Sequence, residues 1–340
     1  MPQPKHILVI RLSAMGDVAM MVPVLKAFTM QHPEVKLTVL TREFFTPFFR
    51  DLNNVSVFPA DLKGRHKGVI GLYKLSKELK ELHIDAVLDL HNVLRTRILK
   101  MFFKEKPFFQ IDKGRAEKKA LITGKSFQQL KTTHERYADV FRKLGFPLDV
   151  SNPCFPKRVE LNSKTISYLQ TDSKKWIGIA PFAAHESKMY PLDLMEKVIE
   201  ILSKTYKILL FGGGEHEIEI LDRIQNKYKN VANLAGKLTL TEELDVISNL
   251  DIMLSMDSGN AHMAAMLGVK VLTIWGVTHP FAGFAPFNQP EDFAILSNRT
   301  KFPLIPTSIY GNKFPNGYQD VSRSIDPNLI VAKIDSVLNS

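Results

Sequence analysis

The sequence predicts an α/β protein of two Rossmann-like domains that face each other across a cleft. Short apolar runs of β type alternate with amphipathic helical stretches through both halves of its 340 residues, which is typical of parallel sheets covered by helices. The length and the 45% hydrophobic content allow two cores of ordinary size. Pro147, Pro153 and Pro156 interrupt regular structure near the middle. We therefore expect an N-terminal domain over 1–158 and a C-terminal domain over 159–340.

The first half is expected to contain five strands. The runs HILVIRL, KLTVLT, NVSVFPA, DAVLDLH and PFFQID occupy 6–12, 36–41, 54–60, 85–91 and 107–112. Between the third and fourth runs, the residues Leu72, Leu75, Leu79 and Leu82 recur at helical spacing and predict an amphipathic helix. A second helix is expected over 93–103.

The second half repeats this organisation without repeating the sequence. Its strand candidates are 176–182, 207–213, 230–236, 251–256 and 270–277, and its helix candidates lie near 191–205, 215–228, 240–250 and 258–267. Asp326 and Pro327 open a final amphipathic helix over 326–338. That helix is a candidate to pack back on the N-terminal domain.

The positive charge of the chain is concentrated in its first half. The formal charge is +10; residues 1–160 contain 28 Lys and Arg against 16 Asp and Glu, whereas 161–340 contain 17 against 19. This asymmetry favours an anionic partner for the first half, and a solvated lysine-rich surface is the alternative. Cys154 is the only cysteine, which excludes an internal disulfide and suits the cytoplasm. Neither a transmembrane run nor a signal peptide is expected.

Three motifs at strand ends point to a nucleotide diphosphate site in the second half. Asp257, Ser258 and Gly259 follow a strand and open a helix, whose free amides and positive dipole suit phosphate. Lys188 also follows a strand, and a lysine there can reach a phosphate oxygen. Glu215 follows three glycines, where an acid can accept hydrogen bonds from ribose hydroxyls. Helix capping and surface exposure are the alternatives for each motif alone.

Four motifs together resemble glycosyltransferase family 9, the ADP-heptose:lipopolysaccharide heptosyltransferases. They are RLSAMGDVAMMVP, SKMYP, FGGGEHE and MDSGNAHMAAMLGVKVLTIWGVTHP, in the same order as in the family. The resemblance implies the GT-B fold and metal-independent transfer with inversion at the anomeric carbon. It implies ADP-heptose as the donor substrate, no cofactor, and the lipopolysaccharide inner core, with Kdo or heptose, as the acceptor.

The resemblance also assigns a role to Asp17, which stands behind Gly16 in a loop that resembles a phosphate cradle but carries an acid. The N-terminal domain of the family takes the acceptor. Asp17 would therefore be the general base that removes the proton of the acceptor hydroxyl. A helix cap is the alternative role.

On the donor side, the resemblance implies that Lys188 neutralises the diphosphate and that Asp257 orients heptose hydroxyls. The amides of Ser258 and Gly259 would hold phosphate. The pocket would be supported by His262, and Glu215 would hold the ribose.

The sequence departs from the family in two places. Ala183 and Ala184 stand where hydroxyl residues are common, so phosphate contacts there would come from backbone N–H groups. The stretch 303–320 lacks the cysteines that relatives often carry.

Basic groups of the first half are the candidates for contacts with an anionic acceptor, because Kdo carboxylates and phosphates need cationic partners. An anionic membrane surface attracts such groups as well, by about 1 kcal/mol for each basic residue near the lipid. We therefore expect a cytoplasmic protein, peripheral on the inner face of the cytoplasmic membrane. The predicted acceptor-binding residues are Ser13, Gly16, Lys63, Arg65, Lys67, Arg95, Arg97, His134 and Arg136.

Two other functions compete with this interpretation. The first is a family 9 enzyme that transfers a different sugar, because the residues that select the sugar are not recognisable. The second is a basic, non-catalytic nucleic-acid-binding protein, which would interleave aromatic residues with its basic clusters. The clusters at 63–67 and 95–100 lack that pattern, so no nucleic-acid partner is expected.

Overall fold

The computed structural model describes residues 3–169 and 174–339, and its backbone contacts divide the chain into two compact units. Unit 1 comprises the chain up to Lys113 together with Thr132–Cys154, and unit 2 comprises Gly114–Lys131 together with the chain from Phe155. The division after Cys154 lies four residues before the predicted boundary. The segment 114–131, which the sequence pattern assigned to the first half, groups with unit 2.

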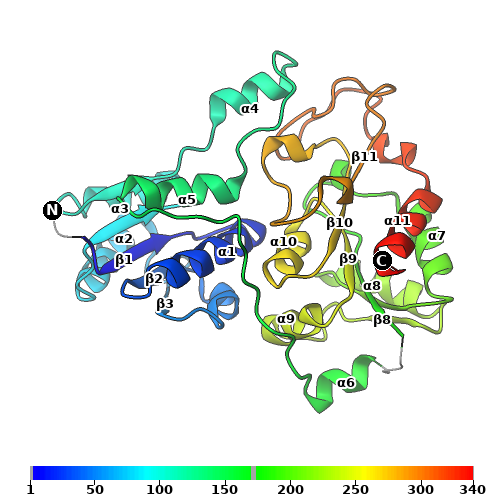
Figure 1. Ribbon diagram of the computed structural model, residues 1–340, viewed down its shortest axis with the longest axis horizontal. Helices are drawn as coiled ribbons and strands as arrows, with labels where there is room; N and C mark the ends of the chain where they lie inside the picture. The colour runs from blue at the N-terminus through cyan, green and yellow to red at the C-terminus, as the bar shows by residue number, and fades with distance from the viewer. Residues whose placement is uncertain (1–2, 170–173, 340) are drawn as a thin grey trace. The chain divides into compact units, whose positions relative to one another are not determined.

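Unit 1 contains one parallel sheet of five strands, in the order β3-β2-β1-β4-β5. These strands correspond to the five that the sequence predicts. Their bounds are β1 (His6–Ile10), β2 (Lys36–Thr41), β3 (Val55–Pro59), β4 (Ala86–Asp89) and β5 (Phe108–Gln110). Figure 1 labels β1, β2 and β3 of this sheet.

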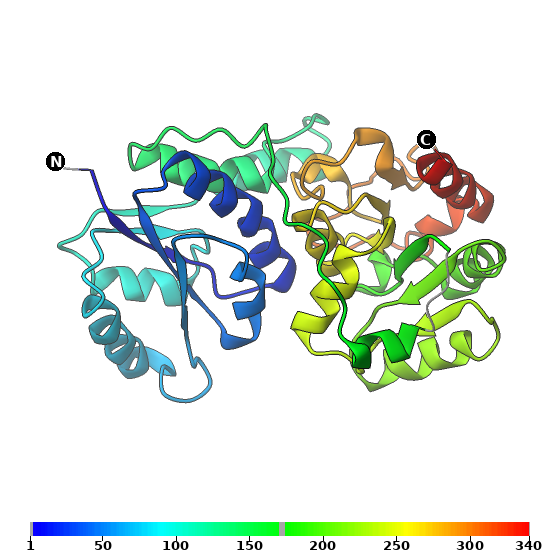
Figure 2. The same ribbon diagram turned by 60° about the horizontal axis from the view of Figure 1, so that its bottom comes forward.

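Helices cover both faces of this sheet (Figure 2). On one face, α1 (Met15–Gln31) packs against α5 (Thr133–Lys143). On the other face, α2 (Gly68–Lys80) packs against α3 (Leu94–Met101). The apolar stripe of α2 lies in the core with Leu8 and Ile10 of β1, which confirms the helix predicted from the leucine spacing. A 3-10 helix, η1 (Glu43–Phe49), follows β2.

Unit 2 contains a parallel sheet of six strands, in the order β11-β10-β9-β6-β7-β8. Five of the strands were predicted. The sixth, β11, has three residues and was not predicted. Their bounds are β6 (Trp176–Ala180), β7 (Lys207–Leu210), β8 (Val231–Asn233), β9 (Ile252–Met256), β10 (Val271–Trp275) and β11 (Ala294–Leu296).

The described helices of unit 2 include the five predicted ones, which are α7 (Leu192–Leu202), α8 (Glu215–Gln225), α9 (Leu240–Ser248), α10 (Gly259–Met266) and α11 (Pro327–Asn339). The unit also contains α4 (Arg115–Ile122) and α6 (Ser163–Leu169), with the 3-10 helices η2 (Glu186–Lys188), η3 (Pro280–Ala282), η4 (Glu291–Phe293) and η5 (Val321–Ser324). Among the described helices, none is long and apolar enough to cross a membrane.

The segment 114–131 belongs to unit 2 because its apolar side chains are buried there. Leu121 and Leu130 pack against Ala282, and the amide of Leu130 donates to the carbonyl of Phe281 over 2.9 Å. A sequence pattern registers an apolar residue but not the surface that covers it.

Helix α11 packs against α7, and its side chains Ile330 and Ile334 are fully buried in the core of unit 2. The helix therefore completes the core of its own unit, and its expected contact with the N-terminal domain stays a prediction.

The order of the strands locates the ligand-binding edge of each unit. In an open parallel sheet, ligands bind at the carboxyl ends of the two neighbouring strands whose connections run in opposite directions. Those strands are β1 and β4 in unit 1, and β6 and β9 in unit 2. Asp17 follows β1, whereas Lys188 and Asp257 follow β6 and β9.

Candidate active site

Asp17 lies in the first turn of α1, directly beyond the carboxyl end of β1. Its carboxylate accepts a hydrogen bond from the amide of Ala14 over 3.2 Å. This contact satisfies one of the amides that a helix start leaves without a partner. Asp17 therefore caps the helix, and a quarter of its side chain remains exposed to solvent.

Arg11 holds the same carboxylate, and sequence reasoning missed it. Its Nη2 lies 2.5 Å from Oδ2 of Asp17, and its Nη1 donates to the carbonyl of Leu90 over 2.7 Å. Burial alone would lower the pKa of Arg11, but Tyr137 and Asp17 raise it overall. A buried guanidinium requires an anion beside it. The one signal in the sequence was a cation inside an apolar strand run.

His91 completes the polar edge of unit 1 and was also missed. It follows β4, and its Nε2 lies 3.5 Å from the hydroxyl of Ser13. Burial, together with the charge of Arg11, lowers the pKa of His91 to about 4, so the ring is neutral at pH 7. Asp89 fixes the backbone there by accepting the amides of His91 and Asn92 over 2.9 Å.

Lys188 and Asp257 meet at the corresponding edge of unit 2. Nζ of Lys188, at the end of η2, lies 2.9 Å from Oδ2 of Asp257. The side chains are only 14% and 9% exposed, so this pair is far less screened by water than a surface salt bridge. The sequence predicted both residues for the donor site but not their contact.

Two further residues hold this pair and were not recognised from the sequence. The hydroxyl of Thr278 donates to Oδ2 of Asp257 over 2.9 Å and is itself buried. Gly311 lies against the aliphatic stem of Lys188, where an added Cβ would overlap that stem. Ser187 donates to the carbonyl of Gly311. The stem of Lys188 is thus packed, whereas its ammonium group is held only by charge.

Helix α10 begins beside Asp257. Ser258 is the residue before the helix, Gly259 is its first residue, and His262 lies buried at the end of the first turn. The hydroxyls of Ser255 and Ser258 lie 3.1 Å apart. The first amides of a helix have no partner within it, so this end of α10 can receive an anion as predicted.

The first turn of α8, directly after the glycine loop that follows β7, contains two acids in different surroundings. Glu215, predicted for the ribose, is exposed at the start of α8. Glu217, which the sequence reasoning passed over, accepts the amide of Gly213 over 2.7 Å. Glu217 therefore shapes the loop, and Glu215 remains available to a ligand.

The two alanines before Lys188 lie in the loop that links β6 to η2. Ala184 is exposed, whereas Ala183 packs partly against the core of unit 2. Their side chains offer no polar atom, so any ligand contact there falls on the backbone.

The predicted acceptor residues of unit 1 fall into two groups. Lys63, Arg65, Lys67, Arg95 and Arg97 are exposed, in the loop before α2 and in the first turn of α3. Within this group Arg65 lies 2.6 Å from Glu78, and Nε of Arg97 donates to Asn92 over 3.1 Å.

The second group lies at the carboxyl edge of the sheet or inside the unit. Ser13 belongs to the β1–α1 loop, and Gly16 lies next to Asp17 in the first turn of α1. His134 and Arg136, on α5, are only 4% and 5% exposed. The basic patterns in the sequence thus combined exposed groups with buried ones, because charge alone does not reveal burial.

Comparison with known proteins decides the family. The sequence model described as Glycosyltransferase family 9 (heptosyltransferase) matches residues 72–303, more than half of the chain. The chain belongs to glycosyltransferase family 9. One family relative, the lipopolysaccharide core heptosyltransferase OpsX of Haemophilus influenzae, is 27% identical over 300 residues, which cover 85% of this chain and 84% of OpsX. The resemblance drawn from the four motifs is confirmed.

Two solved structures bear on the fold of this family 9 chain. A family 9 glycosyltransferase from Veillonella parvula has a TM-score of 0.75 and 20% identity, with coverage of 98% of this chain and 97% of its own. The E. coli heptosyltransferase WaaC, solved with ADP, has a TM-score of 0.67 and 20% identity, with coverage of 98% and 99%. At this identity the likeness concerns the fold, and it confirms the predicted GT-B architecture.

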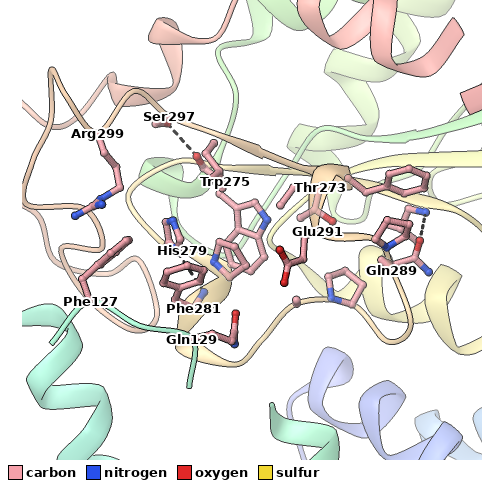
Figure 3. A pocket seen from close by; sticks show the side chains of 18 residues that line it. Phe127, Gln129, Thr273, Trp275, His279, Phe281, Gln289, Glu291, Ser297 and Arg299 are labelled. Atoms are coloured by element: carbon pink, nitrogen blue, oxygen red, sulfur yellow. Dashed lines mark hydrogen bonds between the residues drawn. The ribbon is translucent and has the colours of Figure 1, made fainter. Parts of the chain in front are cut away.

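A separate cavity of about 480 Å3 lies on one face of β10 and β11 in this glycosyltransferase (Figure 3). Trp275 and Thr273 belong to its lining, and Phe127, His279 and Phe281 form a cluster with ring centroids 4.5–5.0 Å apart. The predicted donor residues are not among the described side chains that line it. It is therefore distinct from the strand-end site, and nothing in the sequence analysis anticipated it.

The metal prediction is not tested by the structure. Over 3–169 and 174–339, no three His, Cys, Asp or Glu side chains gather in a way that could hold an ion. Metal independence therefore stays a prediction for experiment.

Proposed function

We propose that this protein is an inverting heptosyltransferase that transfers heptose from ADP-heptose to the inner core of lipopolysaccharide, on Kdo or heptose. The observation that carries the proposal is the Lys188–Asp257 pair beside the N-terminus of α10. A cation, a carboxylate and unpaired helix amides are the groups that a sugar nucleotide needs. The relative WaaC was solved with ADP, which supports the choice of nucleotide.

Donor binding would change the partners of this pair. An ammonium group on a flexible stem can turn from one anion to another, so Lys188 would leave Asp257 for an oxygen of the diphosphate. Asp257 would remain held by Thr278 and would accept hydrogen bonds from the heptose hydroxyls. No metal is needed in this scheme, because the charge that grows on the departing ADP is met by Lys188 and the helix amides.

The remaining contacts with the donor are proposed for residues that lie near the Lys188–Asp257 pair in the sequence or at the other strand ends of unit 2. The amides of Ser258 and Gly259 would bind phosphate, and His262 would support the turn that presents them. Glu215 would hold the ribose from its exposed position at the start of α8. Backbone amides at Ala183 and Ala184 would contribute to the phosphate site.

Asp17 would act as the general base. The oxygen of the acceptor hydroxyl forms a bond to the anomeric carbon while the bond from that carbon to the phosphate oxygen of ADP breaks. The hydroxyl proton passes to the carboxylate of Asp17, and ADP departs with the electron pair. Arg11 orients the carboxylate of Asp17, and a carboxylate held in this way accepts the proton only when the attacking oxygen has become acidic.

The acceptor would be bound through the basic groups of unit 1. Lys63, Arg65 and Lys67 belong to an exposed loop, and Arg95 and Arg97 to the exposed start of α3. Ser13 and Gly16 would contact the acceptor beside Asp17, with His134 and Arg136 supporting that edge from α5. Because such an acceptor is anchored in a membrane, we place the reaction at the inner face of the cytoplasmic membrane.

A donor screen tests the proposal most directly. Purified protein is incubated with deacylated, heptose-free lipopolysaccharide core and, in separate reactions, with ADP-heptose or other nucleotide sugars, and products are identified by mass spectrometry. We expect addition of one heptose from ADP-heptose, at a rate that EDTA does not change. Transfer of another sugar in preference to heptose would replace the proposed donor. A rate abolished by EDTA and restored by a metal would contradict the metal-independent mechanism.

A further inference from the structure

We propose that the outer surface of helices α2 and α3 docks unit 1 on an anionic lipid bilayer. This surface, the α2–α3 face, consists of Val69, Ile70, Tyr73, Lys74 and Lys77 on α2, and Leu94, Arg97, Lys100 and Met101 on α3, together with Lys104 and Lys106 beyond it. The inference deepens the proposed membrane location and rests on that part of the proposed function alone. It involves neither donor binding nor the transfer reaction.

The α2–α3 face exposes large aliphatic side chains. Leu94 is 76% exposed, Ile70 75%, Met101 61% and Val69 58%. Single exposed apolar residues are ordinary on soluble proteins, whereas a group on adjoining elements marks a surface that contacts a partner or a membrane. These four residues lie on two helices that pack against each other.

The packing between the two helices joins their exposed residues into one surface. The ring of Tyr73 on α2 lies 5.5 Å from the ring of Phe102, which directly follows α3. On α3, Leu94 and Met101 are seven residues apart and therefore lie on the same side of the helix. Both helices cover the face of the sheet opposite to α1 and α5 (Figure 2). The aliphatic groups thus lie on the outer layer of unit 1.

Cations surround these aliphatic groups. Residues 63–106 contain eleven Lys and Arg but only five Asp and Glu. Two of those acids are already paired, since Glu78 lies 2.6 Å from Arg65 and Glu105 lies 2.8 Å from Lys80. The surface is therefore left with an excess of positive charge.

A cavity at one end of the face has the chemistry of an anionic headgroup site. It measures about 500 Å3, and the described residues that line it are four cations and three apolar side chains, without an acid: Arg97, Lys100, Met101, Phe103, Lys104, Lys106 and Phe108. The ammonium group of Lys100 lies 5.4 Å from the ring centre of Phe108. An ammonium group at this distance from a ring centre is within the range of a cation–π contact, so cations and aromatic rings adjoin in the cavity.

This combination selects a bilayer as the occupant. Aliphatic tips among lysines are what surface-bound helices present to lipid, with the tips among the acyl chains and the lysines at the phosphates. Helices α2 and α3 begin after β3 and β4, so Ile70 and Leu94 lie near the carboxyl edge of the sheet, where Asp17 and His91 also lie. Docking through this face would bring that edge to the membrane that carries a lipid-linked acceptor.

The test is co-sedimentation of the full chain with vesicles, without donor or acceptor. Vesicles of phosphatidylethanolamine and phosphatidylglycerol are compared with vesicles of phosphatidylcholine alone. The parent protein should bind the anionic vesicles, bind neutral ones at least tenfold more weakly, and dissociate as salt increases.

Two independent variants address the two components of the face. Ile70→Gln with Leu94→Gln removes aliphatic tips, and Lys100→Glu with Lys104→Glu reverses charge at the cavity. Each should weaken binding to anionic vesicles by about tenfold or more. Lys157→Glu with Lys204→Glu makes the same charge change at exposed sites of unit 2 and should leave binding within about twofold. All the substituted side chains are exposed, so the melting temperatures should stay close to that of the parent.

The outcomes separate docking from catalysis. Failure of the parent to bind anionic vesicles would overturn the proposal, and so would equal losses in the unit 1 charge variant and its unit 2 control. Anionic binding unchanged in the Ile70→Gln/Leu94→Gln variant would exclude insertion of the aliphatic tips. Transfer to a deacylated, soluble acceptor is measured separately. If vesicle binding fails while this transfer persists, the docking surface is wrong and the proposed reaction stands.

Discussion

The switch points of unit 1 and unit 2 each hold a carboxylate paired with a cation, but the two pairs are built differently. In unit 1, Arg11 is fixed at both ends of its guanidinium, by Asp17 and by the carbonyl of Leu90. In unit 2, the ammonium group of Lys188 contacts Asp257, and Thr278 holds the carboxylate as well. A planar guanidinium with two fixed partners is rigid, whereas an ammonium group presents three donors that rotate freely.

Under the proposed function, this difference gives the two carboxylates different roles. Asp17 would keep Arg11 as its partner and accept the proton of the acceptor hydroxyl. Asp257 would give up Lys188 to the diphosphate and accept hydrogen bonds from sugar hydroxyls. One arrangement, a carboxylate and a cation at a parallel strand end, would then support proton transfer in one unit and ligand exchange in the other.

The largest expected effect comes from removing the carboxylate of unit 1. Asp17→Asn keeps the size and much of the capping ability, because both residues are good helix caps. Turnover at saturating substrates should fall by about 10²–10⁴-fold, the usual contribution of a general base. Steady-state kinetics give this value, and calorimetry with ADP should show unchanged donor-side binding. A variant within a few-fold of the parent rate would leave Asp17 with structural roles alone, as a helix cap and as the partner of Arg11.

The next prediction concerns His91, which is buried in unit 1 within the influence of Arg11 and Asp17. Burial lowers the pKa of His91 from 6.5 to about 4, so the unfolded chain binds a proton between these values that the folded chain does not. The burial of neutral His91 therefore costs no free energy of unfolding above about pH 6.5, but the free energy of unfolding decreases as the pH falls from 6.5 toward 4. The largest decrease that His91 can cause is about 3 kcal/mol.

Urea unfolding at pH 7 and pH 5 measures this effect in the parent and in His91→Gln. The loss of stability at pH 5 should be smaller in the variant by about 2 kcal/mol. The difference between the two proteins isolates His91 from other groups, such as Glu243, whose pKa burial raises to about 7. Equal pH dependence in both proteins would mean that His91 is accessible and charged.

In unit 2, Lys188→Ala should weaken ADP binding by about 1.5–3 kcal/mol, because a charge-assisted contact to phosphate is lost. Calorimetry measures the change. The matched control is Lys204→Ala, which removes an exposed lysine of the same unit and should leave ADP affinity unchanged. Equal affinity of Lys188→Ala and the parent would confine Lys188 to a structural ion pair with Asp257.

The comparison also shows what the sequence could reveal. Of the described strands, β11 was the one that the sequence did not predict, although β5 and β8, which it did predict, are equally short. The sequence drew attention to Asp17, Lys188 and Asp257 because they lie in segments that follow strands, and the structure places each beyond the carboxyl end of a parallel strand. Arg11 and His91 lie within the predicted strand runs 6–12 and 85–91. A polar residue inside an apolar run interrupts the strand pattern and does not by itself indicate a functional site. The apolar side chains of α11 and of 114–131 are buried by segments distant in the sequence. The periodicity of the sequence shows that such side chains are buried but not which segment covers them.

The central claim is that Lys188 exchanges Asp257 for the diphosphate, and ADP calorimetry on Asp257→Ala tests it most directly. ADP has no heptose for Asp257 to contact, and removal of the carboxylate leaves Lys188 without its competing partner. The account predicts that Asp257→Ala binds ADP at least as tightly as the parent, although turnover with ADP-heptose is lost. If Asp257→Ala weakens ADP binding as much as Lys188→Ala does, the pair acts as one structural unit at the end of the strands, and the proposed exchange is contradicted.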